Sequence, residues 1–156
     1  MEMSPKILIF ALGLLVALPA GAETENPVVE QVRSKALLGY AGAQHNLAEM
    51  YANGYGVDKD STVAAGWYRK SAEQGYGEAQ FRLGLAYLQG EGVPKDEAEG
   101  LAWIILAARP GTSSIVKFRQ KLEQRIAPAL VAAAQVRSKE LLAVIAANKQ
   151  AKAKGK

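Results

Sequence analysis

The sequence predicts an all-α protein: a short right-handed α-solenoid of helix-turn-helix repeats, closed by C-terminal capping helices. Three observations lead to this prediction. Residues 40–75 align without a gap on residues 76–111, a period of 36 residues. Apolar residues in both copies recur at helical spacing, with glycine and aspartate where helices end and begin. Two more apolar stripes at helical spacing follow the repeats.

The repeat is supported by identity between its two copies. Thirteen of the 36 aligned positions are identical, where a match rate of roughly 6% predicts about two. Units of this kind bury their apolar faces on one another when they stack. The identical pairs are Tyr40/Tyr76, Ala43/Ala79, Gln44/Gln80, Leu47/Leu83, Tyr51/Tyr87, Gly54/Gly90, Gly56/Gly92, Val57/Val93, Lys59/Lys95, Asp60/Asp96, Trp67/Trp103, Ala72/Ala108 and Gly75/Gly111.

Residues 1–22 have the pattern of an export signal. A lysine precedes an apolar run, residues 7–18, that is too short to span a bilayer comfortably, and Ala20-Gly21-Ala22 follows. We expect cleavage after Ala22, the alternative being an uncleaved membrane anchor. The chain has no cysteine, which excludes disulfides and a lipid-modified cysteine. We therefore expect a periplasmic or secreted mature chain with no stable membrane insertion.

Residues 23–39 form an N-terminal partial repeat. Asn26 can cap a helix that begins with Pro27 and runs to about residue 38. Ala36 and Gly39 fall one period before Ala72 and Gly75. The segment is therefore expected to be the second helix of a unit that lacks its first helix.

Each complete unit, 40–75 and 76–111, is expected to form two helices. Ala43, Leu47 and Tyr51 are spaced by four residues on one face of the first helix, and their counterparts repeat this face. Gly54, Gly56, Gly90 and Gly92 end the first helices, since glycine tolerates the left-handed backbone there. Asp60 and Asp96 cap the second helices, expected at 61–74 and 97 to about 108. Pro110 and Gly111 are expected to close the second unit.

Residues 112–149 are expected to cover the open end of the stack with capping helices. One apolar stripe runs from Ile115 to Ile126, and a second from Leu130 to Ile145, on either side of Pro128. Residues 150–156 are expected to be a disordered basic tail. They account for much of the net charge of +4 and could attract an anionic partner weakly.

The two units resemble the Sel-one-like repeat (SLR), a variant of the tetratricopeptide-type α-solenoids. The resemblance rests on the Gly-x-Gly-Val-x-Lys-Asp loops at 54–60 and 90–96, Trp67 and Trp103, and the Ala72 and Gly75 positions. It implies a scaffold or adaptor that binds proteins, often in envelope complexes. No catalytic residue is implied, because the repeat itself has none.

The sequence contains few features that would support a catalytic function. His45 is the only histidine, and its counterpart is Phe81, which favours a packing or surface role. No motif of a nucleophilic hydrolase, a metal site or a phosphate-binding loop is present. Trp67 and Trp103 could stack on a sugar, but their matched positions favour core packing. We expect no catalytic residue, metal, cofactor or nucleic-acid partner.

Positions that differ between the first helices of the two units are the candidates for partner binding. We expect them to line a groove and contact an envelope protein or peptide. The alternative for Phe81 and Leu85 is packing on a neighbouring helix. The predicted function is an exported protein-protein interaction scaffold, the alternative being a binder or regulator of envelope polysaccharide or peptidoglycan machinery. Homodimer formation by stacking stays open. The candidates are His45, Asn46, Glu49, Asn53, Phe81, Arg82, Leu85 and Gln89.

Overall fold

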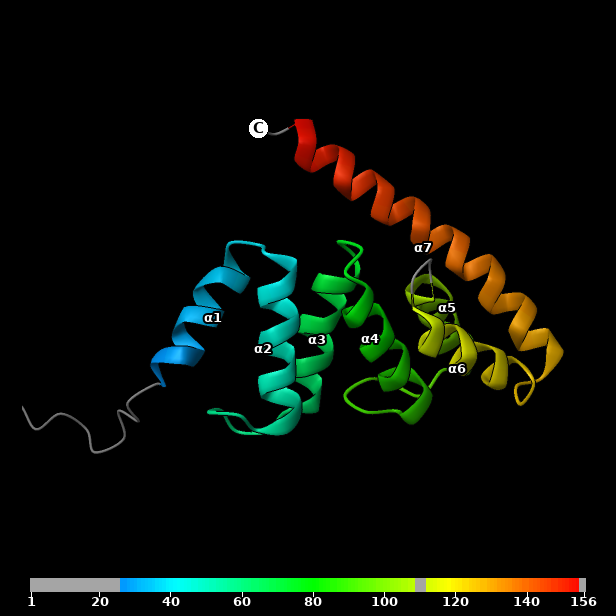
Figure 1. Cartoon of the computed structure of the whole chain (residues 1–156), viewed down its shortest axis with the longest axis horizontal. Helices are drawn as coiled ribbons and strands as arrows, with labels where there is room; N and C mark the ends of the chain where they lie inside the picture. The colour runs from blue at the N-terminus through cyan, green and yellow to red at the C-terminus, as the bar shows by residue number, and fades with distance from the viewer. Residues whose placement is uncertain (1–25, 109–111, 155–156) are drawn as a thin grey trace, which may run out of the picture.

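The computed structural model describes residues 26–108 and 112–154. The expected export signal, Pro110 and Gly111 lie outside these ranges. Within them the chain is all-helical with no strand, which confirms the predicted fold class (Figure 1). The helices are α1 (Pro27–Leu37), α2 (Ala41–Asn53), α3 (Ser61–Ala72), α4 (Gly77–Gln89), α5 (Glu97–Ala107), α6 (Ser113–Glu123) and α7 (Pro128–Lys154).

The helices from α1 to α5 stack side by side in chain order (Figure 1). The pairs α2–α3 and α4–α5 are the two complete units, and α1 packs on α2 as α3 packs on α4. Aspartates start the second helices as expected. The Asp60 carboxylate accepts from the backbone amides of Thr62 and Val63, both at 2.9 Å, and that of Asp96 accepts from Glu99 at 2.9 Å.

Buried glutamines join successive units. The Gln44 side-chain amide donates to the carbonyl oxygen of Ala36 at 3.1 Å, and Gln80 donates to that of Ala72 at 3.2 Å. Both bonds tie a first helix to the end of the preceding second helix. Because Ala36 and Ala72 are one period apart, α1 has the position of a second helix within the stack.

The glycine loops explain how closely the units approach. Gly54 and Gly90 end α2 and α4 with φ of 77° and 73°. Gly92 lies so close to the start of α3 that a Cβ placed on it would be 1.9 Å from the carbonyl oxygen of Ser61. Only glycine leaves room for this contact.

The two tryptophans occupy different environments although their positions match. Trp103 is 2% exposed, in a core with Leu83 and Leu101. Trp67 is only partly buried, and the Lys70 ammonium lies 4.1 Å from its ring centroid. Trp103 belongs to α5, which packs on both α4 and α7, whereas Trp67 belongs to α3, which packs on α2 and α4.

The α7 helix packs on α5 and then extends beyond the stack (Figure 1). Ala134, Leu141 and Ile145 are its buried apolar residues. Arg137 holds it in place through Glu99 of α5, with 2.7 Å between Nε and Oε2. The α6 helix packs on α5 and contains no fully buried residue.

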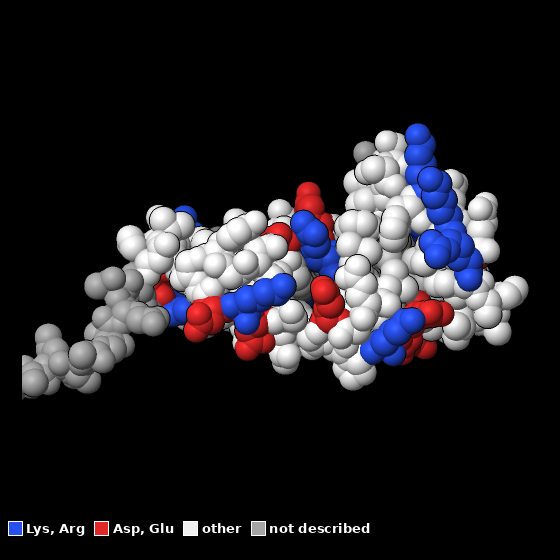
Figure 2. Space-filling view, turned by 90° about the horizontal axis from the view of Figure 1, so that it is seen from below, with Lys and Arg blue, Asp and Glu red and all other residues white. Residues whose placement is uncertain are grey.

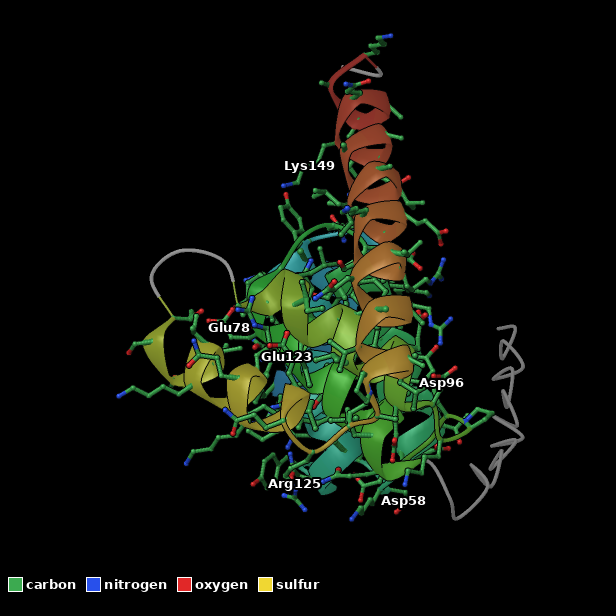
Figure 3. The ribbon with its side chains drawn as sticks, turned by 90° about the vertical axis from the view of Figure 1, so that its right-hand side faces the viewer. Asp58, Glu78, Asp96, Glu123, Arg125 and Lys149 are labelled. Carbon is green, nitrogen blue, oxygen red and sulfur yellow. The ribbon has the colours of Figure 1, made fainter. Side chains whose placement is uncertain are left out.

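The expected boundary between the capping helices and a disordered tail differs from the structure. Residues 150–154 continue α7 as helix up to Lys154. Their alanines, lysines and glutamine are strong helix formers, which explains the continuation. Lys152 also reaches back to hydrogen-bond the side-chain oxygen of Gln74, and Figure 3 shows Lys149 on this projecting half of α7. No helix of residues 26–108 or 112–154 is both long and apolar enough to cross a membrane.

Candidate functional site

The first helices of the two units, α2 and α4, line a hollow of about 210 Å³ together with α3 and the loops that follow α2 and α4. We call it the α2–α4 groove. Its size suits one or two side chains of a peptide, since sites for whole small molecules are usually larger, about 300–1,000 Å³. The lining residues are Glu49, Ala52, Asn53, Lys59, Ser61, Ala64, Ala65, Tyr68, Arg82, Leu85, Ala86, Gln89 and Glu91.

A polar network centred on Glu49 joins the three helices of the groove. Glu49 Oε1 accepts a hydrogen bond from the Tyr68 hydroxyl at 2.5 Å and lies 2.8 Å from Arg82 Nε. The Asn53 side-chain amide donates to the Glu49 backbone oxygen at 2.8 Å. Burial and the Glu49 carboxylate raise the pKa of Tyr68, so its phenol stays a neutral donor. The Arg82 side chain is half exposed and keeps donors free for a ligand.

Five of the eight candidate residues meet in this groove. Glu49 and Asn53 come from α2, and Arg82, Leu85 and Gln89 come from α4. The comparison of the two units therefore identified residues that the fold brings together. The groove combines an ion pair, two amides and the apolar side chain of Leu85.

The other three candidates lie elsewhere. The His45 ring lies 5.7 Å from that of Tyr68 and 5.2 Å from that of Tyr76, measured between centroids. Burial lowers the pKa of His45, although the nearby carboxylates of Glu49 and Glu78 oppose this effect. His45 therefore packs between aromatic rings as a neutral side chain at pH 7.

Asn46 and Phe81 face other neighbours. Asn46 is exposed and lines a hollow on the α1 side of α2. Phe81 makes an edge-to-face contact with Phe118 of α6, with 5.5 Å between ring centroids. Phe81 therefore packs on a neighbouring helix, which is the alternative that the sequence analysis gave for it.

Sequence comparison of the first helices missed four polar groove residues. Tyr68 belongs to a second helix, and Lys59, Ser61 and Glu91 belong to the loops or the first turn of α3. Tyr68 could have been found, because its counterpart in the second unit is Ile104, which is the same kind of difference. Lys59 gave no such signal, because it is identical in both units, whereas Ser61 and Glu91 differ from their counterparts Glu97 and Tyr55 but lie outside the first helices.

Charges of both signs alternate across the lower face of the stack, and a column of basic side chains stands at the end opposite α1 (Figure 2). At that end, the sequence of α6 contains Lys117, Arg119 and Lys121. On the face seen in Figure 2, the described residues of the repeats form no continuous basic stripe of the kind that binds a nucleic-acid backbone. The alternation suits a partner surface that itself contains both charges.

Comparison with known proteins agrees with this architecture. The family model described as Sel1 repeat matches residues 41–76 and 77–111. A solved Sel1 repeat protein from Oxalobacter formigenes shares 38% identity, with a TM-score of 0.58 over 60% of this chain and 70% of that protein. Helicobacter pylori cysteine rich protein B has 24% identity and a TM-score of 0.56 over 59% of this chain and 69% of that chain.

A third similar structure is much longer. It is a protective antigen of uropathogenic Escherichia coli with an SLR fold, 32% identical, with a TM-score of 0.71 over 81% of this chain. The chain spans only 27% of the length of that protein. No curated protein matches the sequence significantly.

Proposed function

Since the chain belongs to the Sel1-repeat family, whose members are protein-protein interaction scaffolds, we propose that it is a non-catalytic scaffold exported to the bacterial cell envelope. In this proposal the α2–α4 groove binds a short segment of a partner protein. Export is supported by the sequence pattern of residues 1–22.

One observation carries the proposal: five of the eight candidate residues that differ between the units line one groove, whereas many of the shared residues are buried in the core. Leu47 and Leu83 are identical and fully buried, while Glu49 and Leu85 differ and line the groove. Packing constrains the shared positions. The variable ones are free to recognise a ligand.

The chemistry of the groove indicates what the partner segment contains. Leu85 and the alanines offer a small apolar wall, and Gln89 and Asn53 offer amide donors and acceptors at its rim. Arg82 is available to a carboxylate, although it is already paired with Glu49. A segment with one short apolar side chain next to an acidic one meets all three features.

The test is crosslinked capture of partners from the native envelope with wild type and the variant Leu85→Glu/Gln89→Ala. Both changed side chains line the groove without belonging to the hydrogen bonds of Glu49. The matched control is Val144→Glu on α7, which puts a carboxylate at an apolar position outside the groove. All three proteins should first show the same cooperative thermal unfolding.

We expect a protein captured by wild type and by the control, and at least about tenfold less of it with the groove variant. Capture that is unchanged by Leu85→Glu/Gln89→Ala would contradict binding in the groove. Binding to isolated peptidoglycan without any captured protein would support the polysaccharide alternative instead.

A further inference from the structure

One side of α1 is an uncovered apolar surface at the N-terminal end of the stack. We call it the α1 end face and define it by Val28, Val32, Lys35, Leu38 and Tyr40. Val28 is 56% exposed, Tyr40 63% and Leu38 76%. Val32, Lys35, Leu38 and Tyr40 line one hollow together with the first turns of α2, residues 41–43 and Asn46. Contiguous exposed apolar surface on a protein indicates an interaction site more often than scattered residues do.

The repeat period identifies what this face is built to contact. One period later, the counterparts of Val32, Lys35, Leu38 and Tyr40 are Tyr68, Ser71, Gln74 and Tyr76. Each of these four side chains contacts α2, the first helix of the unit 40–75. Tyr68 hydrogen-bonds Glu49, Ser71 Oγ donates to the Ala41 carbonyl oxygen at 2.7 Å, Gln74 donates to Gln44 at 2.6 Å, and Tyr76 packs on His45.

The α1 end face is therefore the surface on which the first helix of the partial unit would pack. Val28 shows the consequence most directly. Its counterpart Ala64 is 2% exposed because α2 covers it, whereas Val28 is more than half exposed. Among residues 26–108 and 112–154, no helix covers this side of α1.

The α1 end face is more apolar than the corresponding face of α3. Tyr68 and Gln74 make polar bonds to α2, but Val32 and Leu38 at the same positions are purely apolar. Lys35 replaces a serine, and its aliphatic stem can lie along apolar surface while the ammonium stays in water. The face therefore suits an apolar helix with few polar groups.

From these contacts we infer that the α1 end face binds the same face of a second copy of the chain. The inference relies on the proposed export, because cleavage after Ala22 leaves only residues 23–26 before α1. Four residues make about one helical turn and are too few to cover a helix of 11 residues.

The spacing on α1 makes the face self-complementary. Val28, Val32 and Lys35 are separated by four and three residues, the spacing of a seam between paired helices. A two-fold axis perpendicular to α1 near Val32 places the two α1 helices antiparallel. Helices within a unit, such as α2 and α3, are also antiparallel (Figure 1). The α1 of the second copy thus takes the place and polarity of a first helix.

The first experiment measures the molar mass of the exported chain by sedimentation equilibrium, after mass spectrometry has established its N-terminus. We expect the chain to sediment as a dimer at a protein concentration of about 100 µM. The variant Val32→Glu/Leu38→Glu should weaken association by about tenfold or more, since it places four carboxylates in the two-fold interface. Val136→Glu is the matched control, because Val136 is exposed on α7, and it should stay dimeric.

The second experiment uses the absence of cysteine from the chain. A chain with Val32→Cys can form a disulfide only with a second copy, and two cysteines next to a two-fold axis meet the short Cα separation that the bond requires. Mild oxidation should therefore crosslink Val32→Cys and leave Val136→Cys monomeric.

Three outcomes would overturn the inference. They are a monomer at about 100 µM, a dimer that Val32→Glu/Leu38→Glu leaves intact, and equal crosslinking of the two cysteine variants. A monomer that retains residues 1–22 and shields Val32→Cys from alkylation would show that the N-terminal segment of the chain covers the face instead. If the groove captured no partner, the molar mass of the dimer would not change, so the capture experiment and the mass measurement test the two proposals separately.

Discussion

The contact between Gly92 and the start of α3 predicts a large loss of stability for Gly92→Ala. Gly92 has φ of 70°, and a Cβ there would lie 1.9 Å from the Ser61 carbonyl oxygen and 2.8 Å from the Thr62 nitrogen. Real Cβ atoms essentially never approach another heavy atom closer than 3.0 Å. The loop after α4 must therefore move away from α3 by about 1 Å or more.

Gly39→Ala is the matched control, because Gly39 has φ of 87° and its Cβ would meet nothing within 4 Å. The control isolates the cost of a left-handed backbone, which is about 1–2 kcal/mol for a residue with a Cβ. Gly92→Ala includes the same cost and adds the loss of packing between the two units. We expect it to lower the free energy of unfolding by about 4 kcal/mol or more, a range reached only through disrupted packing or strain.

Urea unfolding followed by circular dichroism measures both variants. Gly56→Ala should fall between them, because its Cβ would meet the side chains of Asn26 and Val29 at 2.9 Å, and side chains move more easily than backbone. A Gly92→Ala protein within about 1 kcal/mol of Gly39→Ala would refute the reasoning. It would mean that the loop can leave α3 without weakening the stack.

Two further predictions concern aromatic and titratable side chains. Trp103→Ala should lower the free energy of unfolding by about 3–5 kcal/mol, and Trp67→Ala should cost clearly less because its ring is only partly buried; equal losses in urea unfolding would contradict this. Burial lowers the pKa of His45 below its ordinary value of 6.5. The unfolded chain therefore binds the proton first, and the native state loses stability as the pH falls below 6.5. His45→Phe should reduce the drop in melting temperature between pH 8 and pH 5, and an unchanged drop would show that other groups cause it.

Local rules explain why much of the fold could be predicted. Asp60, Asp96, Gly54 and Gly90 act within one helical turn, so their effects can be read from neighbouring residues. The second helix of the first unit was expected at 61–74 and is observed at Ser61–Ala72. An error of two residues at a helix end is typical, because helix ends fray.

The candidate site was only partly predictable, because helical periodicity indicates a face but not what lies opposite it. Phe81 and Leu85 share a face of α4, yet Phe81 meets Phe118 of α6 and Leu85 lines the groove. Contact with α6 depends on how the chain returns after the second unit. No spacing within the repeats contains that information.

The repeat, the helices and their order could be read from the chain alone, because the 36-residue period shows in the alignment of the two copies and the capping rules act between neighbouring residues. Which surfaces stay open depends on how segments far apart in the chain pack together. In the folded chain α7 packs on α5, Trp103 is buried and Trp67 only partly so, and one side of α1 stays uncovered. Burial is set by these long-range contacts, and the same apolar spacing occurs on helix faces that are covered and on faces that are exposed.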